Sequence, residues 1–138
     1  MRVYFDSSAL AKRYVEEAGT AQVLEWCERA TELALSVIAV PELISAFCRL
    51  KREGKLTGAQ YRQLKNDLMS DLTDALVCDT TPEVVQHAVA ALEASPLRGM
   101  DALHIGAALA CRADLFVSAD AKQCAAAKAL GLKVASLA

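Results

Sequence analysis

Short apolar runs alternate along the chain with longer segments in which apolar residues recur every three or four positions. Five of the runs have the length of a strand: Val3–Phe5, Leu33–Val40, Ala75–Cys78, Leu115–Val117 and Lys133–Leu137. Short apolar runs of this kind are typical of strands in a parallel sheet. The pattern therefore predicts five strands spread over the whole chain.

The longer segments have the period of amphipathic helices, with apolar side chains on one face. The last one ends at Gly131, a natural C-terminal residue of a helix. The predicted helices are Ala21–Ala30, Glu42–Arg52, a segment that starts at Thr57, a segment with Pro82 in its first turn, Asp101–Arg112 and Ala121–Leu130. The fifth of these is apolar almost all round, so we expect it to be buried.

Helices between successive strands predict the fold class. Parallel strands need crossover connections, and helices supply them on both faces of the sheet. We expect an α/β fold, a three-layer α/β/α sandwich with a mostly parallel central sheet. Because 138 residues fit one compact domain and no linker or repeat interrupts them, residues 1–138 are expected to form a single domain.

Composition excludes several classes of protein. With 54% apolar residues and few Pro and Gly, the chain is not a disordered or collagen-like sequence. No apolar run approaches the ~18 residues of a membrane span, and the opening MRVYFD is no signal peptide. We expect a cytoplasmic protein with no membrane partner. The net charge of −2 argues against nucleic-acid binding by bulk electrostatics alone.

Cysteine and histidine usage argues against a zinc or redox site. The five cysteines form no CxxC motif, and the chain has only two histidines. We expect reduced, mostly buried thiols that pack as small hydrophobic side chains. The cysteines are Cys27, Cys48, Cys78, Cys111 and Cys124.

Four acids occupy positions where ligands bind in sheets of this class. Asp6 ends the first predicted strand, Glu42 follows the second by way of Pro41, Asp101 opens the buried helix, and Asp120 follows the fourth strand. In open parallel sheets the working site lies outside the carboxyl ends of the strands. We therefore expect these four side chains to converge.

Each acid taken alone also fits a helix cap, because carboxylates favour the first turn of a helix. The group as a whole favours a metal site, since a carboxylate beside an apolar segment such as ALHIGAALA is costly unless a positive charge neutralises it. Ser7, Ser8 and Ser118 stand beside the acids, as helix caps or as donors that hold the acid rotamers.

Four motifs carry a resemblance to a known family. FDSSAL, VPELISA, RGMDALHIGAAL and FVSADAKQCAAAKALGL occur in this order from Asp6 to Leu132 and resemble the motifs of PIN-domain ribonucleases. The small size resembles that of the VapC toxins of prokaryotic toxin–antitoxin pairs. SADAKQ departs from the family's TxDxxF pattern, because the aromatic or apolar residue after the fourth acid is missing.

The resemblance implies a metal-dependent endoribonuclease that hydrolyses RNA phosphodiester bonds as the toxin of a type II toxin–antitoxin pair. It also implies three partners: the RNA substrate, a cognate antitoxin and a second copy of the chain in a homodimer. A catalytically inactive PIN-like binding module is the alternative. The implied metal-binding, catalytic residues for Mg²⁺ or Mn²⁺ are Asp6, Glu42, Asp101 and Asp120, and the supporting residues are Ser7 and Ser118.

Other charged residues have less specific interpretations. His104 follows Asp101 by three positions on the same helical face, either as an acid or base or, as we favour, as a packed histidine. A DxD phosphatase is a poor fit because Ser8 stands where the second aspartate belongs. Candidates for phosphate contacts, or simply for solvated helix faces, are Lys12, Arg13, Arg49, Lys51 and Arg52.

Overall fold

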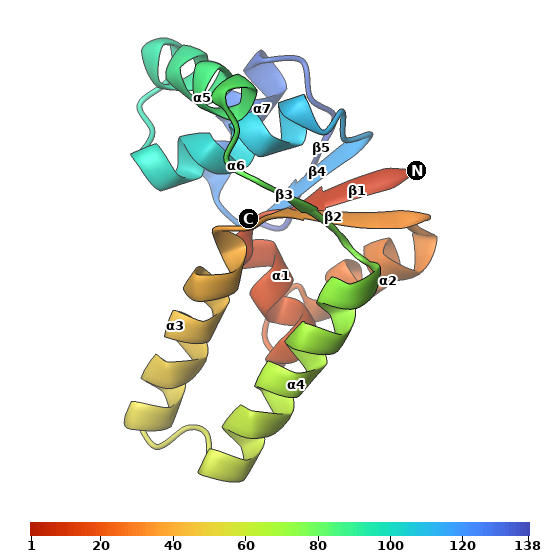
Figure 1. The fold of residues 1–138 in the computed structure, drawn as a ribbon, viewed down its shortest axis with the longest axis vertical. Coiled ribbons are helices and arrows are strands. Elements are labelled where there is room, and N and C mark those ends of the chain that lie inside the picture. The colour runs from red at the N-terminus through yellow and green to blue at the C-terminus, as the bar shows by residue number, and fades with distance from the viewer.

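The computed structural model describes residues 1–138 as five strands and seven helices around one sheet (Figure 1). All neighbouring strands are parallel, and their order is β3-β2-β1-β4-β5. The predicted α/β sandwich with a parallel sheet is therefore confirmed. The strands are β1 (Arg2–Phe5), β2 (Glu32–Ser36), β3 (Leu76–Cys78), β4 (Leu115–Ser118) and β5 (Val134–Ser136).

The helices form the two outer layers (Figure 1). The first four lie on one face of the sheet and the last three on the other. No helix is both long and apolar enough to cross a membrane. The helices are α1 (Ser7–Tyr14), α2 (Thr20–Arg29), α3 (Ala39–Arg52), α4 (Gly58–Asp74), α5 (Pro82–Ala94), α6 (Gly99–Ala110) and α7 (Ala121–Ala129).

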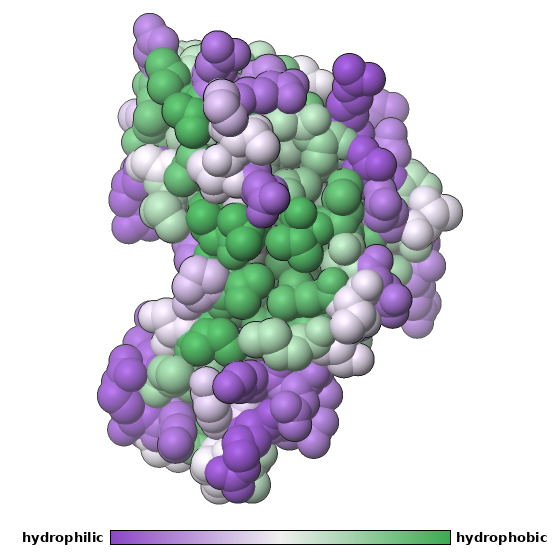
Figure 2. All heavy atoms as spheres, viewed as in Figure 1, coloured by the Kyte–Doolittle hydropathy of each residue, from purple (hydrophilic) through white to green (hydrophobic).

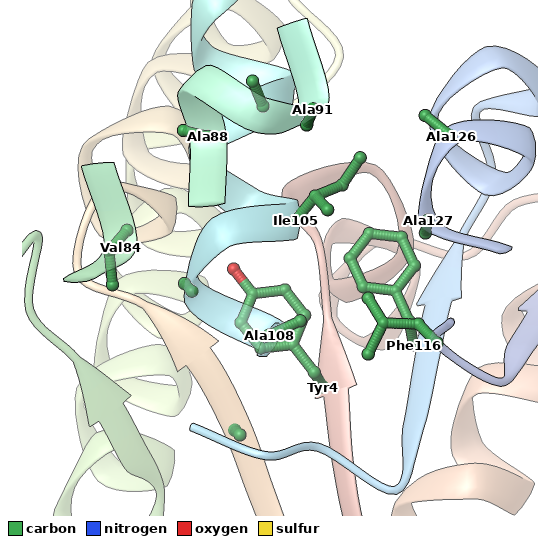
Figure 3. Packing of buried hydrophobic residues seen from close by; sticks show 13 residues of the cluster. Tyr4, Val84, Ala88, Ala91, Ile105, Ala108, Phe116, Ala126 and Ala127 are labelled. Carbon is green, nitrogen blue, oxygen red and sulfur yellow. The ribbon is translucent and has the colours of Figure 1, made fainter. Parts of the chain in front are cut away.

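Two apolar cores follow from the alternation of side chains along the strands. In β1, Val3 and Phe5 point into the core beneath α1–α4, whereas Tyr4 points into the core beneath α5–α7. Figure 3 shows this second core, in which Tyr4 and Phe116 stack with ring centroids 5.6 Å apart. Most of its other members are alanines, and small side chains let α5, α6 and the sheet approach closely.

The predicted helix starts agree with the structure to within two residues, except that α3 begins at Ala39 and not at the predicted Glu42, and the buried helix is confirmed. Thr57 caps α4 in a reciprocal capping box with Gln60, and Pro82 occupies the first turn of α5. Helix α6 buries six of its residues. The sequence interpretation did not name α1, a short helix that follows Asp6 directly.

The predicted strand Leu33–Val40 was wrong in its second half. Strand β2 ends at Ser36, the chain turns at Val37 and Ile38, and α3 begins at Ala39. The apolar run LALSVIAV crosses a strand end and a helix start, because Leu35 of β2 and Ala39 of α3 are buried in the same core and Ala34 is buried in the other. Pro41 then falls within the first turn of α3, where a missing N–H costs nothing.

The prediction of mostly buried thiols was also wrong, although all five cysteines are free as expected. Only Cys124 is buried; the other four are partly exposed, and three of them, Cys27, Cys78 and Cys111, pack against the cores.

An ion pair on the α1–α4 side joins two helices of this layer. Asp71 of α4 accepts hydrogen bonds from Arg13 Nε and Nη2 at 2.8 and 3.1 Å and from the Tyr14 hydroxyl at 2.7 Å. Partial burial of Asp71 opposes its ionisation, but the hydrogen bonds from Arg13 and Tyr14 outweigh burial and lower its pKa. The pair therefore stabilises the fold when Asp71 is ionised.

Replacing Asp71 with asparagine is expected to lower the free energy of unfolding at pH 7 by about 1.5–3 kcal/mol, the range for hydrogen bonds to charged groups. Because the folded pKa is lowered, this contribution is complete above the ordinary aspartate pKa of about 4 and is lost as the pH falls through the folded value. Urea unfolding at pH 7 and pH 3 measures the difference. The exposed Asp74→Asn is the control, and an equal loss at both pH values would contradict the assignment.

Candidate functional site

All four predicted acids lie at the edge of the sheet to which the carboxyl ends of the strands point. Asp6 follows β1, Glu42 lies in the first turn of α3, Asp101 in the first turn of α6, and Asp120 follows β4. Figure 2 shows that the molecule is hollowed on this side, between the two helical layers. The strand order places β1 between β2 and β4, so Asp6 lies between the other acids.

Three of the acids line two neighbouring cavities. Glu42 and Asp101 line a cavity of about 640 Å³ whose remaining wall is mainly the apolar side of α5 and α6. Asp101 and Asp120 line a second cavity of about 640 Å³ between the starts of α6 and α7. Asp101 thus borders both cavities and stands between Glu42 and Asp120.

Asp6 is the most deeply buried of the acids, with 2% of its surface exposed. Its Oδ1 accepts hydrogen bonds from the Ala9 backbone N–H at 2.9 Å and the Ser8 hydroxyl at 2.8 Å, and its Oδ2 accepts one from Ser118 at 2.6 Å. The predicted cap is confirmed, since the bond from Ala9 is the N-cap of α1. Burial raises the pKa of Asp6 even against these three hydrogen bonds.

Two serines connect Asp6 to the loop that carries Asp120. The Ser118 hydroxyl donates to Asp6 and accepts from the Asp120 backbone N–H at 3.0 Å. The Ser8 hydroxyl donates to Asp6 and accepts from the Ala119 N–H at 3.1 Å. The predicted supporting place of Ser118 beside an acid is therefore present in the structure, and Ser8 holds the same acid.

Glu42 is held by a hydroxyl and an imidazole. Its Oε1 accepts a hydrogen bond from the Ser7 hydroxyl at 2.6 Å and lies 2.7 Å from Nε2 of His104. Partial burial opposes ionisation of Glu42, but the hydrogen bonds from His104 and Ser7 prevail and lower its pKa. Ser7, which follows Asp6 in sequence, thus supports Glu42 and makes no contact with Asp6 through its hydroxyl.

Asp101 and Asp120, like Glu42, are more open to solvent than Asp6. Asp101 faces Nε of Arg98 at 3.6 Å, although the Arg98 side chain is 88% exposed. Asp120 caps α7 by accepting from the Gln123 N–H at 3.0 Å. The buried Gln123 side chain in turn donates to the Asp101 backbone oxygen at 3.1 Å, which fixes the two acid-bearing turns to each other.

The four carboxylates are the type of ligand that a hard divalent cation prefers, but they do not lie close together in this structure. No three His, Cys, Asp or Glu side chains stand close enough together to hold an ion between them. Each acid, however, keeps a carboxylate oxygen with acceptor capacity, because a carboxylate oxygen can accept two hydrogen bonds. Asp6 Oδ2 accepts one, and no hydrogen bond reaches Glu42 Oε2, Asp101 Oδ1 or Asp120 Oδ2.

Comparison with known proteins identifies the family. The PIN domain family matches residues 3–129. The chain belongs to the PIN domain family. Ribonuclease VapC45 of Mycobacterium tuberculosis (strain CDC 1551 / Oshkosh) is 31% identical over 108 residues, which cover 78% of this chain and 75% of the relative.

Solved structures share the fold of this PIN domain at low sequence identity. A toxin–antitoxin complex from Klebsiella pneumoniae matches with a TM-score of 0.70 and 17% identity, over 99% of this chain and 98% of that chain. VapC20 of Mycobacterium tuberculosis, described as a sarcin-ricin loop cleaving toxin, matches with a TM-score of 0.66 and 15% identity, over 94% and 95%. The predicted PIN-like fold is confirmed.

Several residues around the acids of this PIN domain were absent from the predicted set. Lys122 lines the second cavity beside Arg98. Its place two residues after Asp120 in the sequence could have predicted that it lies near the acids. The role of Gln123 could not be predicted in this way, because its side chain in α7 donates to the backbone oxygen of Asp101 in α6. Among the predicted phosphate-binding residues, Arg13 is bound to Asp71 and Lys12 to Glu17 at 3.3 Å.

Proposed function

We propose that this PIN-domain protein is an endoribonuclease that hydrolyses RNA phosphodiester bonds with the help of a divalent cation. The observation that carries the proposal is Asp6, a carboxylate that is 2% exposed and pairs with no Lys or Arg side chain. A buried carboxylate costs free energy unless positive charge compensates it. Three further acids at the same edge of the sheet make a cation the natural source of that charge.

The oxygens that remain free are the ones we assign to the ion. Carboxylate oxygens suit Mg²⁺ or Mn²⁺, hard ions that bind through a few such ligands and keep several waters. We assign direct ligation to Asp6 and Asp101, and the orientation of water or of a second ion to Glu42 and Asp120. A bound Mg²⁺ or Mn²⁺ supplies a hydroxide from coordinated water and stabilises the charge that develops on the phosphate.

Basic residues beside the acids provide contacts for the RNA backbone. Arg98 and Lys122 line the cavity between Asp101 and Asp120, and Lys12 and Arg49 line a third cavity that includes Glu42. These cations offset the repulsion between a phosphate chain and four carboxylates. The largely exposed Arg98 side chain has the freedom to exchange Asp101 for a phosphate oxygen.

The biological role we propose is that of the toxin in a toxin–antitoxin pair, in the cytoplasm where RNA is abundant. The similarity to a ribonuclease VapC and the fold shared with a toxin–antitoxin complex support this role. A cognate antitoxin and a second copy of the chain are the proposed protein partners. An inactive PIN-like binding module is the alternative, but a module without chemistry has no reason to place four acids at one edge of the sheet.

The test is cleavage of a mixed pool of transfer and ribosomal RNA by the purified protein. We expect defined fragments in Mg²⁺ or Mn²⁺, none in excess EDTA, and recovery when Mn²⁺ is added back. Calorimetric titration with MnCl₂ in the absence of RNA is the second measurement. Metal uptake without cleavage of any RNA would favour the binding module, and the absence of both would refute the metal-dependent nuclease.

A further inference from the structure

His104 is buried in the interior of the protein, and both of its ring nitrogens have partners. The residue belongs to α6 and is 2% exposed. Nδ1 lies 2.8 Å from the Tyr4 hydroxyl, and Nε2 lies 2.7 Å from Glu42 Oε1 and 3.2 Å from the Ser7 hydroxyl. The Tyr4 ring meets the imidazole edge-on, with centroids 6.1 Å apart. The imidazole therefore connects the sheet to an acid of the site.

The direction of these hydrogen bonds follows from the partners. An ionised carboxylate has acceptors only, so Nε2 carries the hydrogen and donates it to Glu42. In the neutral ring Nδ1 is then the acceptor, and the Tyr4 hydroxyl donates to it. Burial raises the pKa of Tyr4 well above its ordinary value, so the hydroxyl keeps its proton. Tyr4 thus selects the tautomer that holds Glu42.

The consequence for Glu42 is that its two oxygens are no longer equivalent. Oε1 accepts from both Ser7 and His104, which uses the two acceptor positions of that oxygen. Oε2 accepts no hydrogen bond and is the oxygen left for an external ligand. Because Ser7 and His104 come from α1 and α6, the orientation of the carboxylate depends on both layers of the sandwich.

We propose that His104 is a positioning residue that makes Glu42 present Oε2 alone to the second divalent cation, the one that we assign to Glu42 and Asp120. The inference rests on the proposed function, because it requires that Glu42 serve a bound cation. A histidine with only a packing role would need no partner in the site, whereas Nε2 of His104 donates to one of the four acids. Donors that orient a metal-binding carboxylate commonly contribute 10- to 100-fold in metal affinity.

The test compares two substitutions of His104, each of which places a side-chain amide near the position of one of the two ring nitrogens. In His104→Gln the amide N–H reaches toward the place of Nε2 and can still donate to Glu42. In His104→Asn the amide stays near Nδ1 and Tyr4 and is too short to reach Glu42. The two variants are measured by MnCl₂ calorimetry without RNA and by thermal unfolding. We expect the Mn²⁺ dissociation constant to rise about 10- to 100-fold in His104→Asn and to stay close to the wild-type value in His104→Gln.

The outcomes separate positioning from packing and from the proposed function. A role in packing alone would lower the melting temperature of both variants and leave their Mn²⁺ affinity alike, which would overturn the inference. Unchanged Mn²⁺ affinity in a folded His104→Asn protein would overturn it as well. If the wild-type protein itself takes up no Mn²⁺, the metal-dependent function fails, and the role of His104 fails with it.

Discussion

Replacing Asp6 with asparagine is expected to abolish RNA cleavage and leave the protein folded. The amide keeps the shape of the side chain and an oxygen that accepts from Ala9 and Ser8, so the cap of α1 survives. The negative charge that attracts the cation is lost. Losing about 4 kcal/mol of electrostatic stabilisation of the transition state corresponds to a fall of about 1,000-fold in kcat/KM.

The stability of this variant is predicted from the raised pKa of Asp6. Since burial raises the folded pKa of Asp6, its contribution to stability is complete below the unfolded pKa and is lost as the pH rises through the folded value. At neutral pH the ionised side chain therefore destabilises the metal-free protein. Asparagine removes that charge, but its Nδ2 cannot accept the hydrogen bond from Ser118, so we expect the two effects to offset each other and the free energy of unfolding to stay close to that of the wild type.

Asp79→Asn is the matched control for this substitution. Asp79 also follows a strand directly, at the same edge of the sheet, but it is exposed and belongs to none of the three cavities around the acids. Cleavage rates at saturating Mn²⁺ and thermal unfolding of both variants are the measurements. An Asp6→Asn protein that cuts RNA at the wild-type rate, or an Asp79→Asn protein equally impaired, would refute the special role of Asp6.

The hydrophobic pattern was sufficient to predict the sheet and the place of the acids. Parallel strands buried between two helical layers have short apolar runs, and the residue after such a run lies at a fixed edge of the sheet. Asp6 and Asp120 were therefore placed by the strands before them, and Asp101 by the apolar helix that it opens. The same pattern failed between Ser36 and Ala39, where strand, turn and helix are all apolar.

Ser8 and Ser118 were predicted beside the acids, but the partners of Glu42 could not be predicted from the sequence. Ser7 is adjacent to Asp6, yet its hydroxyl turns to Glu42, 35 positions away. His104 was placed on the Asp101 face of its helix, but its pairing with Tyr4 and Glu42 spans 100 and 62 positions. Such contacts depend on the angle and separation of packed layers, which no local pattern encodes. The local contacts of the acids lie three residues apart: Arg98 with Asp101, and the caps that Asp6 and Asp120 form with Ala9 and Gln123.

Gly106 in the middle of α6 is a second feature that periodicity alone did not explain. Glycine weakens a helix by about 1 kcal/mol relative to alanine, so its presence needs a reason. A Cβ atom at this position would lie 2.4 Å from the Val84 carbonyl oxygen and 3.1 Å from the Ala88 backbone nitrogen. Both neighbours belong to the backbone of α5 and cannot rotate away. Gly106 therefore permits the close approach of α5 to α6.

Gly106→Ala is expected to reduce the free energy of unfolding by about 1–3 kcal/mol or more, because overpacking a well-filled core forces backbone shifts that outweigh the gain in helix propensity. Gly99→Ala is the matched control, since Gly99 opens the same helix and an added Cβ would meet no atom within 4 Å. We expect that control to equal or slightly exceed the wild type. Urea unfolding measures both variants. If Gly106→Ala proved as stable as Gly99→Ala, α5 and α6 would have room to separate, and the close helix contact would not be what requires glycine in ALHIGAALA.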